Sequence, residues 1–152
     1  MGNRRPPAWN HWAEVVWRDP KTPKFLGDMP HTWVGSDFMR SVLDMLAYER
    51  EDDDALVVGA GVTRDWVTTA PGVIVKGLHT YYGPLSYTMR ADGDRVRVRL
   101  EGLTRTPPGG IVLRSPLDTP VRSVTVDGRA VKLAAPGELR LHRLPATVEL
   151  RH

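Results

Sequence analysis

Beyond residue 55, apolar and polar residues alternate in short runs that are separated by turns rich in glycine and proline. Alternation with a period of two is typical of strands with one buried face, whereas an amphipathic helix needs a period of 3.6. Two of the turns contain an Asp-Gly step, Asp92-Gly93 and Asp127-Gly128, and this step strongly indicates a β-hairpin. The 14 glycines and 13 prolines among 152 residues also favour many short elements over long helices.

The alternating runs predict about eight or nine short strands. We place them at residues 55–60, 72–76, 83–90, 95–101, 111–114, 121–126, 130–133, 138–141 and 146–151. Turn signals at intervals of about 8–12 residues are typical of an antiparallel β-sandwich. The sequence therefore predicts a mainly β fold, with the sandwich domain at residues 54–152.

One amphipathic helix is predicted before the strands, at residues 31–50. Its apolar stripe recurs every four residues, at Val34, Phe38, Val42 and Leu46. Thr32 and Ser36 are candidate N-caps because a hydroxyl can accept a hydrogen bond from a free backbone N–H. The acidic run at residues 49–54 is expected to end the helix, since carboxylates at a C-terminus oppose the helix dipole.

Residues 1–30 form a third region, rich in tryptophan and proline. Trp9, Trp12 and Val16 recur at helical spacing, which predicts a short helix around residues 9–17. Pro20 and Pro23 would stop such a helix because proline lacks the backbone N–H.

Composition excludes several kinds of protein. The chain has no cysteine, so disulfides and thiolate metal sites are excluded. Its N-terminus lacks the apolar run of about 7–15 residues that a signal peptide carries, and no stretch approaches the roughly 20 apolar residues of a membrane span. With a formal charge of only +3, we expect a cytoplasmic protein with no cofactor and no membrane contact.

Two charged motifs have an ordinary explanation. Arg95, Arg97 and Arg99 alternate with apolar residues, which suits either a basic stripe that follows phosphates or the solvated face of a strand. We favour the solvated face, and with it little affinity for nucleic acid, because no aromatic residues are interleaved. The three aspartates at residues 52–54 lack the ligand spacing and distal glutamate of a calcium loop, so a solvated connector is expected there.

A carboxylate, an imidazole and an indole gather just before the helix, at Asp28, His31 and Trp33. Polar groups of this kind can hydrogen-bond sugar hydroxyls while an aromatic ring stacks on the sugar. The alternative is structural: Trp33 begins the apolar stripe of the helix, and Asp28 and His31 cap and brace the turn. The chemistry alone favours the structural alternative.

A second aromatic group consists of Tyr81, Tyr82 and Tyr87, with His79 beside it. The Gly83-Pro84 turn follows Tyr82 directly, so one or two of these rings are expected at the surface, where they could bind carbohydrate. Tyrosine rings also pack at sheet edges with their hydroxyls in water, without any binding role.

The order of these motifs resembles the C-terminal region of the six-hairpin, (α/α)6-barrel glycosidases, including α-L-rhamnosidase-like and glycogen-debranching-like enzymes. The resemblance covers roughly residues 10–115. It is carried by GDMPHTW at residues 27–33, DALVVGAGV at residues 54–62 and GLHTYYGPLSY at residues 77–87. In that family, the last barrel helix carries an H-x-W motif and a β-domain follows, entered by a strand with the motif T-x-x-G-x-(L/I)-S.

The resemblance implies that His31 and Trp33 line a sugar pocket at the mouth of the barrel, with Asp28 matching less directly. The general acid and base of such enzymes lie on earlier barrel helices, which have no counterpart here. Since glycoside hydrolysis generally needs two carboxyl groups across the scissile bond, we expect no hydrolysis by this chain. We expect a detached tail, either a fragment or a short independent reading frame.

The expected function is that of a non-catalytic accessory β-domain of a carbohydrate-active enzyme, structural or in weak contact with sugar. Two alternatives stay open: a free-standing carbohydrate-binding module that uses Tyr81, Tyr82 and Tyr87, and, less favoured, a basic nucleic-acid-binding domain. A barrel would cover the helix on two sides. Without it, Phe38, Val42 and Leu46 are expected to mediate self-association or docking onto a helical barrel, because large exposed apolar patches mark interfaces.

Overall fold

The computed structural model describes residues 12–14, 27–28 and 30–152. The chain divides into two compact units, Met1–Leu43 and Asp44–His152, and each is treated by itself. The helix expected around residues 9–17 lies outside the described residues, apart from residues 12–14. Helix α1 (Thr32–Leu46) crosses from the first unit into the second.

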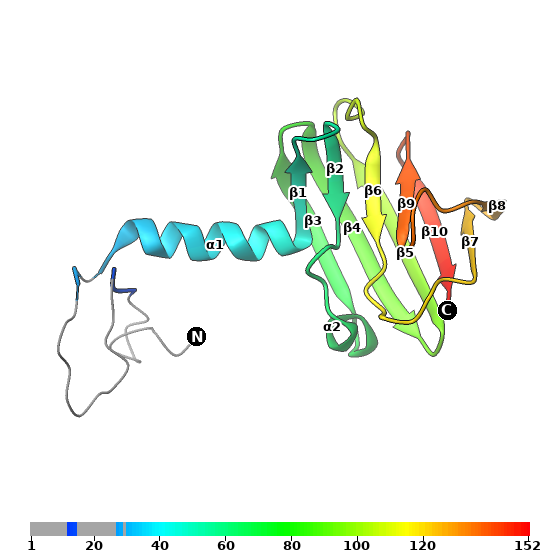
Figure 1. Ribbon diagram of the computed structural model, residues 1–152, viewed down its shortest axis with the longest axis horizontal. Coiled ribbons are helices and arrows are strands. Elements are labelled where there is room, and N and C mark those ends of the chain that lie inside the picture. The colour runs from blue at the N-terminus through cyan, green and yellow to red at the C-terminus, as the bar shows by residue number, and fades with distance from the viewer. Residues whose placement is uncertain (1–11, 15–26, 29) are drawn as a thin grey trace. The chain divides into compact units, whose positions relative to one another are not determined.

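The C-terminal unit contains two β-sheets, as Figure 1 shows. The smaller sheet has the strand order β1 (Ala47–Arg50), β2 (Ala55–Val58), β6 (Ile111–Arg114) and β9 (Glu138–Leu141). The larger sheet has the order β3 (Val73–Thr80), β4 (Gly83–Asp92), β5 (Arg95–Gly102), β10 (Ala146–Arg151), β7 (Ser123–Val126) and β8 (Arg129–Val131). Neighbouring strands run antiparallel except β2 and β6, which are parallel. A short helix, α2 (Arg64–Thr68), connects β2 to β3.

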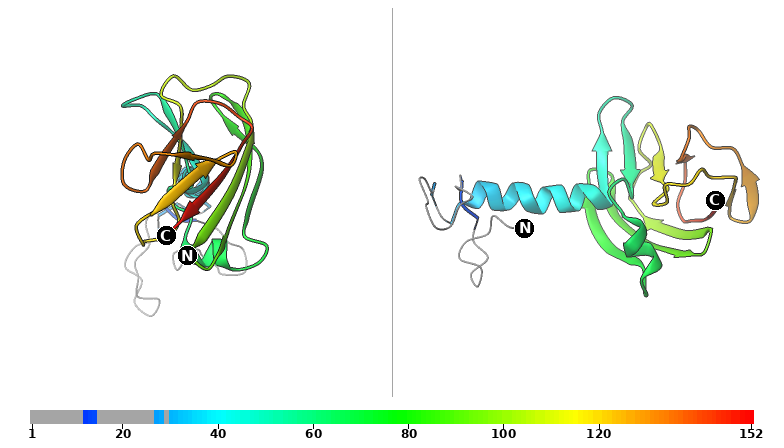
Figure 2. Two further views of the ribbon diagram at one scale, coloured as in Figure 1. Left: turned by 90° about the vertical axis from the view of Figure 1, so that its right-hand side faces the viewer. Right: turned by 60° about the horizontal axis from the view of Figure 1, so that its bottom comes forward.

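The hydrophobic core lies between the two sheets, which form two layers in Figure 2. Strand β5 shows how one face of a strand enters this core: Val96, Val98 and Leu100 are fully buried, while the residues between them are more exposed. These side chains belong to one cluster with Leu56 of β2 and Leu113 of β6. The predicted mainly β fold and sandwich are therefore confirmed, because inward-facing residues of both sheets share one core.

The predicted end of the helix is wrong. Helix α1 ends at Leu46, and Ala47–Arg50 forms the strand β1. This strand pairs with β2 through a turn in which Asp54 adopts a left-handed backbone conformation. The acidic run therefore closes a hairpin instead of ending a helix, because pairing with β2 outweighs the local helical pattern. The structure accordingly has ten strands in its described residues, one more than the upper expectation.

Backbone hydrogen bonds within the C-terminal unit fix the end of α1. The N–H groups of Gly59 and Gly61 donate to the carbonyls of Leu46 and Met45, at 2.9 and 3.0 Å. The Tyr87 hydroxyl also donates to the Leu46 carbonyl, at 3.1 Å. A Cβ at Gly61 would lie 2.8 Å from Cα of Met45, so this close approach requires glycine. The last helical carbonyls, which have no partners within a helix, are satisfied here by the sandwich.

Candidate functional site

The turn before α1 holds His31 as a helix cap. Its Nδ1 accepts a hydrogen bond from the Val34 N–H at 3.3 Å, in the place where Thr32 or Ser36 was expected to act. The Ser36 hydroxyl instead donates to the Trp33 carbonyl at 2.8 Å. The His31 N–H donates to the Trp12 carbonyl at 2.6 Å. These bonds give His31 the bracing role of the structural alternative.

Trp33 differs from that alternative, because it is 72% exposed and does not begin a buried stripe. Its ring lies 6.5 Å from the His31 ring, centroid to centroid, at an interplanar angle of 23°. Asp28 is exposed, and its carbonyl accepts a hydrogen bond from the Glu14 N–H at 3.2 Å. The three residues thus lie on one turn, and only Trp33 presents a large exposed ring. Whether they contact sugar stays a prediction.

Of the three tyrosines in the second aromatic group, only Tyr81 is exposed, at 77%. Tyr82 and Tyr87 are buried, and their hydroxyls donate to the carbonyls of Asp54 and Leu46. Burial also raises the pKa of the Tyr87 hydroxyl. A sugar-stacking surface of three rings is therefore not formed, and Tyr82 does not offer a ring face to a ligand.

The Tyr81 turn is held in place from two sides. The Glu49 carboxylate accepts a hydrogen bond from the Tyr81 N–H at 2.7 Å, and Arg105 donates to the Tyr81 carbonyl at 3.1 Å. The Arg105 guanidinium also lies over the Tyr81 ring, 4.8 Å from its centroid. This arrangement places an aromatic ring beside a cation and an anion on the surface.

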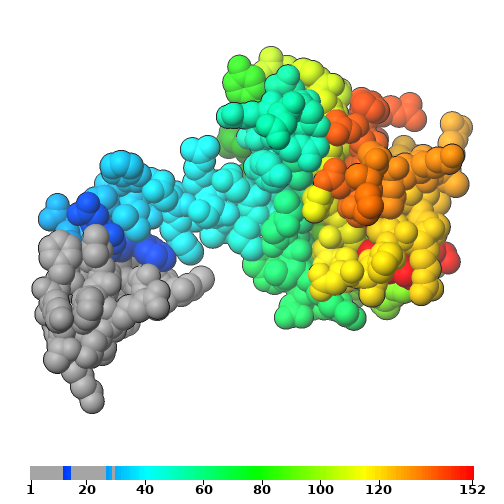
Figure 3. All heavy atoms as spheres, in the orientation of Figure 1, coloured from blue at the N-terminus to red at the C-terminus, as the bar shows by residue number. Residues whose placement is uncertain are grey.

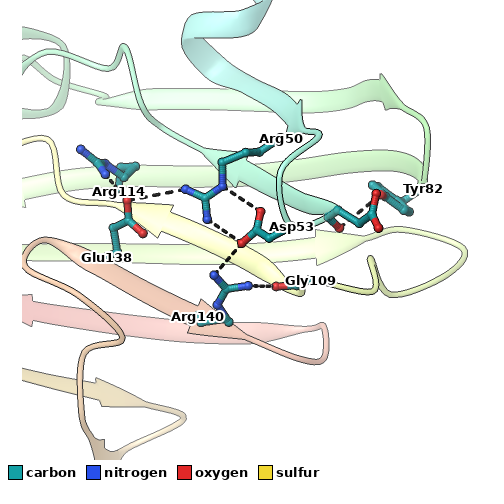
Figure 4. A network of polar contacts seen from close by, with 8 residues as sticks. Arg50, Asp53, Tyr82, Gly109, Arg114, Glu138 and Arg140 are labelled. Atoms are coloured by element: carbon teal, nitrogen blue, oxygen red, sulfur yellow. Dashed lines mark hydrogen bonds and ion pairs between the residues drawn. The ribbon is translucent and has the colours of Figure 1, made fainter.

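A polar network that the sequence did not indicate covers the outward side of the smaller sheet (Figure 4). Asp53 accepts two hydrogen bonds from Arg50, at 2.8 and 2.9 Å, and one from Arg140 at 2.8 Å. Glu138 pairs with Arg114 and, at 3.7 Å, with Arg50. Hydrogen bonds from Arg50 and Arg140 hold the pKa of the Asp53 carboxyl far below its usual range.

The network explains why apolar residues on the outward side of this sheet are buried. Val57 and Val112 are each 1% exposed and form a small cluster outside the main core. Arg140 lies directly opposite Val112 in the strand register, and arginine stems can cover apolar surface while their charged ends stay wet. In Figure 3, side chains of this sheet and its connections cover this side of the unit. We therefore assign the network a structural role.

The alternation of Arg95, Arg97 and Arg99 marks the solvated face of a strand, as predicted. All three lie on the outward side of β5, and Arg97 and Arg99 have side chains 64% and 67% exposed. Glu149 of β10 pairs with Arg95 and Arg97, each at 3.4 Å. Desolvation raises the pKa of Glu149, but hydrogen bonds from Arg151 and Arg97 outweigh it and lower that pKa overall.

The described residues include one serine–histidine pair. His152 is 5% exposed, its Nε2 lies 3.0 Å from the Ser115 hydroxyl, and its Nδ1 lies 2.6 Å from the Thr119 carbonyl. Since a carbonyl only accepts, Nδ1 carries the proton. Two N–H groups of this loop are also paired: that of Ser115 donates to the Gly137 carbonyl, and that of Leu117 donates to the Ser115 hydroxyl. These hydrogen bonds hold His152 against the loop at residues 115–119.

Other catalytic arrangements find little support in the described part of the chain. Asp65 and Asp118 line one hollow of about 430 Å³, but both are exposed, whereas a general acid is usually kept protonated by an apolar environment. Among the described residues, no group of three or more His, Cys, Asp or Glu side chains could hold a metal ion. No described helix is long and apolar enough to cross a membrane.

Comparisons with known proteins give no identification. No family model, no curated protein and no solved structure matches this chain. The resemblance to glycosidases therefore stays a hypothesis that rests on its sequence motifs.

The Asp53 network should make stability depend on pH. Because the folded-state pKa of Asp53 lies below its unfolded value of about 3.9, the network stabilises the fold above that pH and loses this effect as the pH falls through the folded pKa. We expect Asp53→Asn to lower the free energy of unfolding at neutral pH, and the difference from the unchanged protein to shrink below about pH 4. Urea titrations across this pH range measure it.

Asp52→Asn is the matched control, since Asp52 is an exposed aspartate in the same turn. Its pH profile should follow that of the unchanged protein. A difference for Asp53→Asn that stays constant down to pH 2 would contradict the assigned role of the ionised carboxylate.

Proposed function

We propose that this chain is a non-catalytic accessory β-domain of a carbohydrate-active enzyme, and that α1 is its docking element. The observation that carries the proposal is the composition of the α1 surface. None of the residues of α1 is buried, although the helix is rich in apolar side chains. Large exposed ones are Trp33, Met39, Val42 and Leu43, at 72%, 61%, 37% and 47%.

The spacing of the exposed residues gives them a common face. Met39, Val42 and Leu43 are separated by three and four positions, so they are neighbours on one side of the helix. An exposed apolar face of this kind usually marks an interaction surface. A helical partner, such as the barrel implied by the sequence motifs, would cover it by ordinary helix packing.

Two of the three residues that were expected to mediate docking contact other residues of the chain itself. Phe38 is partly buried and stacks on Trp12, with ring centroids 4.6 Å apart. Leu46 packs against the core of the sandwich. Of the three residues first assigned to docking, Val42 is the one with an exposed side chain, so we now assign docking to Met39, Val42 and Leu43.

The arrangement of polar groups favours an accessory role over a catalytic one. Charged side chains in the described residues form ion pairs with each other, as Arg97 does with Glu149 across two strands and Arg140 does with Asp53. The two carboxylates that share a hollow, Asp65 and Asp118, are both exposed, whereas glycoside hydrolysis needs one carboxyl group that stays protonated as the general acid.

The docking proposal predicts self-association in the absence of another partner. Light scattering over roughly a hundredfold concentration range should show a mass that rises above that of one chain. The double variant V42E/L43E should stay monomeric, because charges on the docking face oppose its burial. Ser41→Glu adds a charge elsewhere on the same helix and should leave association unchanged. A monomeric mass at every concentration would refute self-association and leave only a different helical partner.

A second candidate, a free-standing carbohydrate-binding module, is favoured by the exposure of Tyr81 beside Arg105 and Glu49. We expect Tyr81→Ala to weaken any binding seen on a glycan array by about tenfold or more, and Tyr81→Phe to preserve it, because stacking depends on the ring. His79→Ala, which removes another exposed ring from β3, is the control. Equal binding by Tyr81→Ala and the unchanged protein would exclude Tyr81 as the sugar contact.

A further inference from the structure

The outward side of the larger sheet carries a dense group of cations. It includes Lys76 of β3, Arg90 of β4, Arg95, Arg97 and Arg99 of β5, and Arg151 of β10. We call this surface the arginine face.

Like charges lie directly opposite each other on the arginine face. Arg90 is the cross-strand partner of Arg97, and Arg95 is the partner of Arg151. Directly opposed like charges destabilise a sheet. Repulsion within these two pairs therefore lowers the stability of the fold. A role in binding anions would explain why the arginines are present.

The carboxylates on this face do not balance the cations. Glu149 is shared by Arg95, Arg97 and Arg151, at 3.4, 3.4 and 3.3 Å. The other carboxylates are Glu101, paired with Arg99 at 3.4 Å, and Asp92, directly opposite Arg95. Six cations against three carboxylates leave a charge of +3, as large as the formal net charge of the whole chain. The net charge of the arginine face thus equals the net charge of the whole chain.

Hydroxyl groups lie between the guanidiniums. Thr88 and Thr147 flank Arg99 on the two neighbouring strands. A hollow of about 330 Å³ lies beside them, and its lining includes Lys76, Ser86, Arg99 with its paired Glu101, and the apolar Ile74, which is 51% exposed. Cations, hydroxyls and a small apolar surface together match the carboxylates, hydroxyls and C–H groups of a uronic-acid polymer.

We propose that the arginine face binds an acidic polysaccharide through its carboxylates. Guanidinium groups bind carboxylates in a bidentate, charge-assisted manner, and the exposed ends of Arg97 and Arg99 are accessible for this. The proposal rests on the proposed function, because it names the class of carbohydrate that the accessory domain would hold.

Nucleic acid is the competing polyanion, and the face suits it less. Outward positions of β4, β5 and β10 hold proline, serine, threonine, arginine and acidic residues, and the one aromatic ring on these described strands, that of Tyr87, is buried on the inward side. Proteins that bind single strands combine positive charge with aromatic rings on which bases stack. A flat sheet face also lacks a helix or ribbon that could enter the major groove of a duplex.

The test compares the full chain with the double variant R97Q/R99Q and with the control R129Q/R143Q, which removes the same charge from exposed arginines elsewhere. The probes are polygalacturonate, neutral dextran, poly(dT) and a DNA duplex, measured by calorimetry at low and moderate salt. We expect binding to polygalacturonate and none to dextran. The affinity should fall about tenfold or more in R97Q/R99Q and stay nearly unchanged in the control. It should also weaken as salt screens the charges.

Thermal unfolding separates a binding role from a structural one. R97Q/R99Q removes two exposed ion pairs, which contribute little to stability, and the repulsion between Arg97 and Arg90, so it should unfold at about the same temperature as the unchanged protein or higher. Absence of polygalacturonate binding, an equal loss in both double variants, or tighter binding to either DNA than to polygalacturonate would overturn the proposal. A clear fall in thermal stability would also contradict it, since the arginines would then serve the fold.

The result of the polygalacturonate test can be distinguished from the result of the docking test. Polygalacturonate binding by a chain whose α1 shows no docking would refute the accessory role alone. Docking through α1 without polygalacturonate binding would refute only the present inference.

Discussion

Burial of inward-facing side chains between the two sheets is the interaction on which the rest of the structure depends. Tyr87 shows how far this dependence reaches: its ring is buried in the core, and its hydroxyl donates to the last carbonyl of α1. The end of the helix is therefore fixed by the same side chain that fills the sandwich. The outward sides of the sheets are left to charged residues, which pair on the smaller sheet and accumulate unbalanced charge on the larger one.

The sequence predicted the parts of the fold that depend on local patterns. Strands such as β5 and β7 follow from alternation and from Asp-Gly turns, and the outward direction of Arg97 follows from the same period. The strand β1 was missed because Ala47–Arg50 continues the helical pattern locally, and only pairing with β2 makes it a strand. Pairing between strands decides such cases, and the periodicity of one segment carries no information about its partner.

The same limit applies to the candidate site. Tyr81, Tyr82 and Tyr87 look alike in the sequence, but Tyr87 faces inward from β4, and of the two turn residues Tyr82 is buried while Tyr81 is exposed. The Asp53 network joins residues from three segments of the chain, so it could not be predicted without the strand order. The position of Trp33 next to a capping His31 was foreseeable, whereas its exposure was not, since it depends on what the helix packs against.

The central proposal is that α1 presents an exposed apolar face, at Met39, Val42 and Leu43, which a partner covers. Hydrogen exchange of the backbone amides tests this claim most directly. In dilute protein, amides of the middle of α1 should exchange much faster than those of β4, β5 and β10, because exposed helices open locally. At high concentration, or with a helical partner, the protection of α1 should rise while that of the sandwich stays the same. Protection of α1 equal to that of the core strands in dilute protein would contradict the account.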